Sequence, residues 1–264
     1  MTRTMKALLA LFAALCAGVA RAEAPPTFAP GEETSFRVTY LGLSTGEGKI
    51  SIGPAQGELW PVIFQAKTNG VASVVDIREH LAAYWDSPRQ LTRGTDLMAY
   101  ELGDFHQDSA RFDRERNQVT VVEAHRGKEP KKKTLDIAEG TLDLTGSFLW
   151  LRLQPLEVGR HLEVPVVTGT TRFTLVADVL AREEVTTPAG TFPAYKLSVH
   201  TEIPGKFSTK RESFLWLADR PGQFLVKASA DFAVGSVVVE LTGYHPGASQ
   251  LAAAEPARGV TAAP

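Results

Sequence analysis

Apolar and polar residues alternate one by one through much of this sequence, and this pattern restricts the possible folds more than any other feature. Alternation with a period of two places every second side chain on the same face of a β-strand. Each alternating segment therefore predicts a strand with one buried face. These segments are 35–40, 49–52, 173–179, 195–200 and 237–242.

Turn-forming residues separate the alternating segments. They occur at 116–117, 187–190, 204–205 and 219–222. In the second of these, Pro188 presets the φ angle of a turn and Gly190 follows two residues later, which favours a hairpin. Many short strands joined by hairpins predict an antiparallel β protein, with its sheet curled or closed into a barrel.

The segment that follows Asp143 has helical rather than strand spacing. Leu144, Phe148 and Leu151 are spaced i, i+4 and i+7, Asp143 is a capping residue type, and Pro155 stops the segment. Because apolar residues also occupy its other faces, we expect the helix to pack against or insert into the sheet. The predicted fold is mostly β: a curled antiparallel sheet or incomplete β-barrel with one short helix packed on it.

The first 22 residues have the features of a secretory signal peptide. Arg3 and Lys6 precede an apolar run, and Ala20-Arg21-Ala22 forms a small-x-small cleavage site. We therefore expect cleavage after Ala22 and a periplasmic location. A lipid anchor at Cys16 is disfavoured because that processing prefers a small residue where Leu15 stands.

The remaining chain divides into an extended leader (23–30), a single β domain (31–245) and a tail rich in Ala, Pro and Gly (246–264). Removal of the signal peptide takes away three basic residues and the one Cys, which leaves a more acidic, thiol-free chain. We therefore expect no nucleic-acid partner and no disulfide. No interior apolar run is long enough to predict a transmembrane segment.

The one basic run, 126–133, has two interpretations. A solvated hairpin tip that protects a strand edge is the favoured one. Contact with anionic head groups at a membrane surface is the alternative.

Several stretches, in order along the chain, resemble a family of exported bacterial proteins of unknown function, DUF3108. The resemblance implies a β-rich envelope protein and supplies no catalytic residues. The chain departs from the family pattern at 222–224. By analogy with curled periplasmic sheets, the fold is also similar to carriers that hold lipids or peptides on a concave face. The matching stretches are 30–32, 36–42, 46–50, 75–80, 143–152, 155–159, 187–192 and 214–219.

The sequence contains one literal catalytic pattern, the G-x-S-x-G segment around Ser44. A nucleophile elbow needs a helix after the serine, whereas the residues after Ser44 continue as an alternating strand, so we expect no catalytic site. The histidines are spread along the chain, and Asp104, His106 and Asp108 fall in a polar stretch of loop character. We expect solvated side chains there, with no metal site and no cofactor.

The candidate ligand-binding residues are Glu79, Trp85, Trp150 and Trp216. The tryptophans would pack in the core of a filled sheet, or line the concavity of an open one. Glu79 is a carboxylate in an otherwise apolar row, so it would form an internal salt bridge or a polar anchor in a binding cleft.

The first functional hypothesis is a non-enzymatic envelope protein that binds a lipid or another apolar ligand on a concave β surface. The alternative is a structural or adaptor protein with a filled core that acts through protein contacts. A hydrolase that uses Ser44 is the third.

Overall fold

The computed structural model describes residues 28–70, 72, 76–203, 213–231 and 235–248. The predicted signal peptide, the leader up to residue 27, the predicted turn at 204–205 and the tail from residue 249 lie outside the described residues.

All strands belong to one antiparallel sheet of 14 strands. From one edge, the order runs backwards along the chain from β8 to β1, continues with β14, and runs backwards again to β9 at the other edge. The strands are β1 (Glu33–Tyr40), β2 (Leu43–Ile52), β3 (Leu59–Thr68), β4 (Ile77–Asp86), β5 (Leu91–Glu101), β6 (Asp104–Asp113), β7 (Gln118–His125), β8 (Lys131–Asp136), β9 (His161–Thr168), β10 (Thr171–Thr187), β11 (Gly190–Glu202), β12 (Ser213–Ala218), β13 (Leu225–Asp231) and β14 (Ser236–His245).

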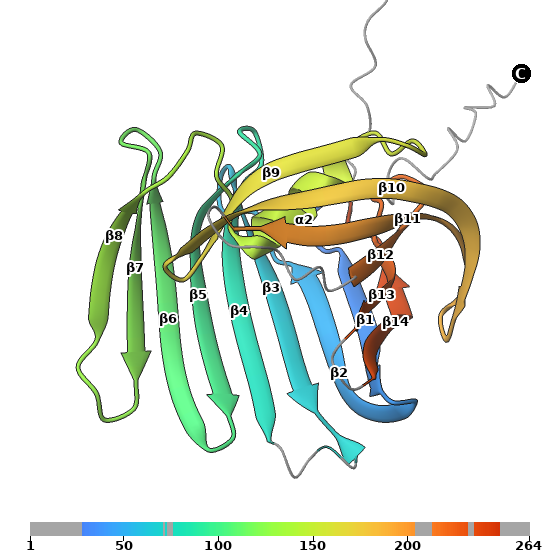
Figure 1. Cartoon of the computed structure of the whole chain (residues 1–264), viewed down its shortest axis with the longest axis horizontal. Coiled ribbons are helices and arrows are strands. Elements are labelled where there is room, and N and C mark those ends of the chain that lie inside the picture. The colour runs from blue at the N-terminus through green and yellow to red at the C-terminus, as the bar shows by residue number, and fades with distance from the viewer. Residues whose placement is uncertain (1–27, 71, 73–75, 204–212, 232–234, 249–264) are drawn as a thin grey trace, which may run out of the picture.

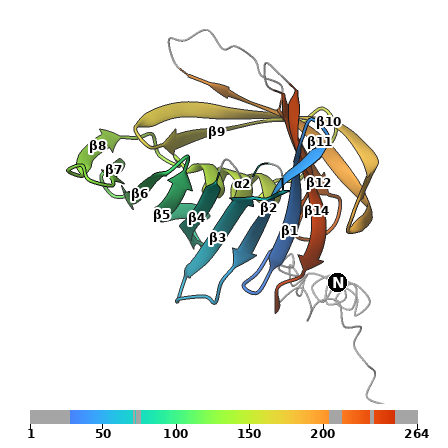
Figure 2. The same cartoon turned by 90° about the horizontal axis from the view of Figure 1, so that it is seen from below.

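The sheet curls around the helix α2 (Leu144–Leu153), which contacts β9 and β4. Strands β9 to β11 lie on one side of α2, and the wall formed by β2 to β5 lies on the other (Figures 1 and 2). The predicted fold, a curled antiparallel sheet or incomplete β-barrel with one short helix packed on it, is confirmed for the described part of the chain, where the sheet is open.

The main hydrophobic core lies between α2 and the curled sheet. It includes Trp85 of β4, Leu149 and Leu151 of α2, Phe224, and Leu241 of β14, all at most 1% exposed. Burial of large apolar side chains stabilises a fold by about 1.5–3 kcal/mol each. This core therefore includes side chains from the helix and from strands distant in the sequence.

Asp143 begins α2 as predicted. Its carboxylate accepts hydrogen bonds from the backbone N–H groups of Gly146 (2.9 Å) and Thr145 (3.0 Å), and so satisfies the free donors of the first turn. The helix ends at Leu153, two residues before Pro155.

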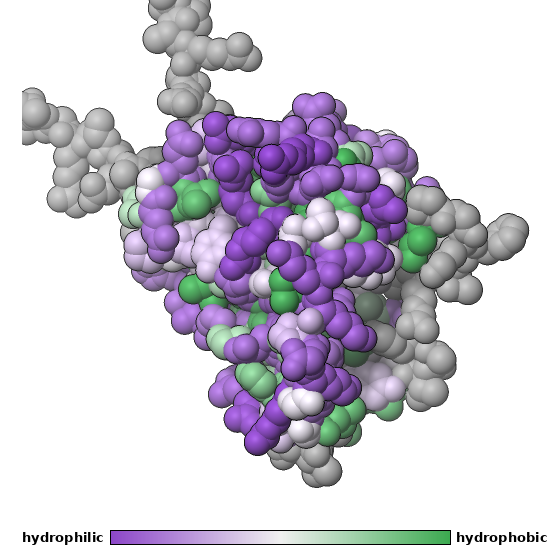
Figure 3. Space-filling view, turned by 90° about the vertical axis from the view of Figure 1, so that its left-hand side faces the viewer, coloured by the Kyte–Doolittle hydropathy of each residue, from purple (hydrophilic) through white to green (hydrophobic). Residues whose placement is uncertain are grey.

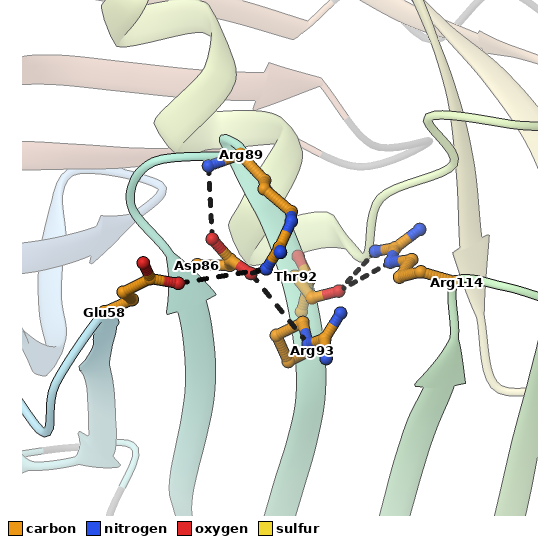
Figure 4. A network of polar contacts seen from close by, with 6 residues as sticks. All are labelled: Glu58, Asp86, Arg89, Thr92, Arg93 and Arg114. Carbon is orange, nitrogen blue, oxygen red and sulfur yellow. Dashed lines mark hydrogen bonds and ion pairs between the residues drawn. The ribbon is translucent and has the colours of Figure 1, made fainter.

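A polar network at the ends of β4 and β5 fixes the chain beside the helix (Figure 4). Asp86, which is 2% exposed, lies 3.0 Å from Arg89 Nη1 and 4.0 Å from Arg93 Nε.

Arg114 donates to the carbonyl oxygens of Thr92 and Thr141, and the Thr92 hydroxyl donates to Asp143. Burial lowers the pKa of Arg114 to about 10. The network therefore connects the β4–β5 hairpin to the helix N-terminus.

The basic run lies on the β7–β8 hairpin and continues along β8, the edge strand of the sheet. Lys131, Lys132 and Lys133 are exposed there. The molecular surface on the β8 side is mostly hydrophilic, with scattered hydrophobic residues (Figure 3). Charged edge residues oppose edge-to-edge pairing with another sheet.

Ser44 lies within β2, opposite Thr39 of β1. It is followed by more strand rather than a helix, as its alternating surroundings predict.

The prediction of a loop around Asp104, His106 and Asp108 is wrong, because these residues belong to β6. Pairing with β5 on one side and β7 on the other compensates for the polar composition of β6.

None of the described helices has the length and hydropathy needed to span a bilayer.

Candidate functional site: an apolar cavity on the concave face

A cavity of about 470 Å³ opens on the concave face of the sheet, beside the N-terminal end of α2. Most of its lining is apolar and comes from β3 to β7, the helix and the strands across from them. Lining residues from these elements include Phe64, Leu81, Leu97, Val121, Phe148 and Val167. This volume is within the range of about 300–1,000 Å³ found for small-molecule sites.

The strand register explains how residues distant in sequence form the apolar lining. Leu81 of β4 lies opposite Phe64 of β3 and Leu97 of β5. Directly opposite residues project from the same face of an antiparallel sheet, so these three side chains form one row across the concave wall. Leu144 forms part of the same lining and is 54% exposed.

One end of the concave wall is polar. Glu79 lies next to this apolar row on β4, and Asp108 lies opposite Leu97 on β6; both line the cavity. The register continues the polar surface through Glu123 of β7, which lies opposite Asp108. This row therefore changes from apolar on β3 to β5 to acidic on β6 and β7.

Glu79 lies on the face that the alternation predicts. Burial, together with a hydrogen bond from Glu79 to Glu101, raises the pKa of the Glu79 carboxyl above 4.5. Within the part of the chain that the structure describes, no Lys or Arg forms an ion pair with Glu79. Among the described residues, Glu79 is therefore not half of an internal salt bridge. It is a polar group in the cavity wall.

Asp108 is the second acid in the cavity wall. Burial raises the pKa of its carboxyl, while the nearby His106 acts in the opposite direction. Its Oδ1 atom is buried and has no hydrogen-bond partner among the described residues. An unpaired buried oxygen is costly, so this end of the cavity favours a ligand that can donate a hydrogen bond or carry positive charge.

The three tryptophans chosen from the sequence do not line this cavity. Trp85 is 1% exposed and packs in the core. Trp216 donates to Glu183 (2.6 Å) and lies between Lys196 and Lys227, each 5.3 Å from its ring. Trp150 packs against the core from α2. Alternation predicts the face of a side chain and not its position along the wall, which is why Phe64 and Phe148 line the cavity instead.

The polar side chains of the cavity lining carry hydroxyl and carboxyl groups. This lining, taken over the described residues, contains no His, Cys or Lys, and Ser44 lies outside it. The lining hydroxyls and carboxyls belong to Glu79, Thr95, Asp108, Ser109, Asp143, Thr145 and Thr168. Its chemistry is that of an apolar pocket with an acidic end.

Comparison with known families gives a match over most of the folded chain. A family model described as a protein of unknown function, DUF3108, matches residues 35–242. These residues include every strand from β2 to β13 and the helix. No curated protein matches the chain.

Among solved structures, the chain is similar to a β-barrel-like protein of the DUF1849 domain from Brucella abortus. The identity is 9%, the TM-score is 0.57, and the match covers 83% of this chain and 98% of that one. At this identity the likeness shows the fold alone.

Two further structures match at lower TM-scores. One, provisionally described as a lipoprotein from Parabacteroides distasonis, has 13% identity and a TM-score of 0.35, over 84% of this chain and all of that one. The other, provisionally described as an exported protein with a YmcC-like fold from Bacteroides fragilis, has 12% identity and a TM-score of 0.33, over 83% and 98%.

Proposed function

This chain belongs to the DUF3108 family, whose function is unknown, and we propose that it is a non-enzymatic protein of the cell envelope that binds a lipid or another apolar ligand on its concave face. The cavity of about 470 Å³ beside α2 is the observation that supports this proposal. The signal-peptide features of residues 1–22 support export to the periplasm.

The composition of the cavity wall favours an elongated amphiphile. Apolar side chains of β3 to β7 and α2 can cover a hydrocarbon segment, while Glu79 and Asp108 can meet its polar end. Each buried methylene contributes about 0.8 kcal/mol, so affinity should rise with the length of acyl chain that the cavity covers. The alternative, an adaptor protein with a filled interior, receives less support because this cavity is open.

Native mass spectrometry of protein purified from its own envelope tests the proposal. We expect a co-purified lipid mass, and displacement of an apolar fluorescent probe by that lipid. A lipid-free protein that also fails to bind the probe would contradict the proposal.

A pair of adjacent substitutions locates the binding surface. Leu97 faces the cavity, whereas Met98 is 45% exposed and, by alternation, projects from the opposite face of β5. Leu97→Trp fills the cavity, and we expect probe affinity to fall at least tenfold. Met98→Trp adds the same indole outside and should bind the probe as the native protein does. Equal effects of the two substitutions would place the probe elsewhere.

A further inference from the structure

Two histidines that are distant in the sequence form a cross-strand pair on the concave face. His106 of β6 lies opposite His125 of β7, and their rings stack with centroids 5.3 Å apart. Asp104, two residues before His106, places its Oδ2 atom 3.3 Å from His125 Nδ1. One possible ligand atom from each of the three residues lies within 4.8 Å of the other two.

From this geometry, we propose that Asp104, His106 and His125 form a binding site for a divalent transition-metal ion of the Zn²⁺ class. Imidazole nitrogen and carboxylate oxygen bind Zn²⁺ at about 2.0–2.2 Å. The three ligand atoms, now within 4.8 Å of one another, would have to move closer together by side-chain rotation to bind one ion. Three protein ligands leave at least one coordination position for water or a bound ligand.

The charges around the three residues favour a cation. Glu101 lies directly opposite Asp104, and Glu123 lies directly opposite Asp108. Like charges in directly opposite positions destabilise a sheet. An added cation would relieve this repulsion. Stacking of the His106 and His125 rings would not.

Among the described residues, the edge strand β8 brings basic residues next to this surface. Lys131 of the edge strand β8 lies opposite Glu123, and it is exposed. Arg126, which follows β7, is also close to His125 in the chain. Neither forms an ion pair with Asp104, Asp108 or Glu123 among the described residues.

The metal site is separate from the apolar part of the cavity, although both lie on the concave face. Asp108 connects them: it lines the cavity, and its Oδ2 atom lies 3.9 Å from His106 Nε2. The β6–β7 hairpin is held by its own backbone pairing. The protein therefore does not need the ion to form this part of the fold, and metal binding can be tested without lipid.

Calorimetric titration of the purified, chelator-treated protein with Zn²⁺ at pH 7.5 tests the site. We expect one equivalent to bind. His106→Gln and His125→Gln should each weaken binding at least tenfold, and the double variant should abolish it. His80→Gln is the matched control, because His80 is also on a strand of this sheet but contacts Gln65 instead. It should bind Zn²⁺ as the native protein does.

Two further measurements guard against loss of folding as the explanation. Asp104, whose side chain is 58% exposed, can be changed to Asn with little effect on folding, and Asp104→Asn should also weaken binding. The electron paramagnetic resonance spectrum of bound Cu²⁺ should show coupling to two nitrogen ligands. Absence of binding, or binding that survives the double histidine change, would overturn the proposal.

Discussion

The guanidinium of Arg152 lies 2.7 Å from the carboxylate of Glu32, and the two side chains are 2% and 3% exposed. Arg152 belongs to the last turn of α2, whereas Glu32 immediately precedes β1. The same guanidinium donates to the carbonyl oxygen of Gly222 and lies over the ring of Phe28 at 4.7 Å. One cation thus joins the helix to the segment before β1 and to the turn between β12 and β13.

Removal of one partner of this ion pair should destabilise the protein strongly. Arg152→Met leaves Glu32 buried without its counter-charge, and we expect the free energy of unfolding to fall by about 3–5 kcal/mol. Urea denaturation followed by circular dichroism measures the loss. Arg37→Ala, which breaks the exposed 2.9 Å pair with Glu240, is the control and should cost less than about 1 kcal/mol. Similar losses in both variants would contradict this account.

At position 146, in the first turn of α2, glycine should give a more stable protein than alanine, which is the reverse of the usual order in helices. Alanine in place of glycine stabilises an ordinary helix by about 1 kcal/mol. A Cβ atom at Gly146 would overlap the Thr92 hydroxyl and lie 2.8 Å from Asp143 Oδ1, the atom that caps the helix. We therefore expect Gly146→Ala to lower the melting temperature. A higher melting temperature would show that the Thr92 and Asp143 side chains can move away from the added methyl group without loss of stability.

His161 should titrate above its ordinary pKa. It lies 2.9 Å from Glu163 and 2.7 Å from Asp178, and hydrogen bonds to these two carboxylates raise its pKa above 6.5. Below pH 6.5 the imidazole is charged in both folded and unfolded chains, so both ion pairs contribute fully. Their contribution is lost as the pH rises through the folded pKa. Histidine NMR titration measures the pKa, which Glu163→Gln should lower; an unchanged value would contradict the assignment.

Leu144 should contribute more to ligand binding than to folding. It lines the cavity yet is 54% exposed, so a bound apolar ligand would cover it. On the proposed function, Leu144→Ser weakens probe binding about tenfold while the free energy of unfolding changes by less than about 0.5 kcal/mol. Val158→Ser is the control, because Val158 is 60% exposed and lies outside the cavity lining. Probe titration and urea denaturation of both variants separate the two effects.

The local part of the fold follows from the sequence because its causes are local. Period-two alternation around Phe36 and Leu197 predicts strands, and Asp143 with Pro155 marks the limits of the helix. The pairing of β1 with β14 has no local signal. It depends on how the whole sheet curls around the core, so only the structure reveals it.

The site was only partly predictable for the same reason. Alternation predicts that Glu79 shares a face with Leu81, and both residues line the cavity. The neighbourhood of His106 and His125 arises from the register of β6 with β7, and the short turn at 116–117 was the one sequence signal for that hairpin. The sequence does not predict the pairing of β6 with β7, because residues 104–108 have the composition of a loop. A polar strand on an acidic concave surface has few of the apolar residues that mark strands.

The pairing of β14 with β1 also determines how late in synthesis the sheet can be completed. Arg37 and Glu240, which face each other across this pair, are separated by 203 residues. During synthesis β1 is made early and lacks this neighbour until nearly the entire chain has emerged. A product that ends before Ser236 therefore exposes unpaired backbone on both β1 and β13, and becomes a substrate for proteases and aggregation rather than a shorter working protein.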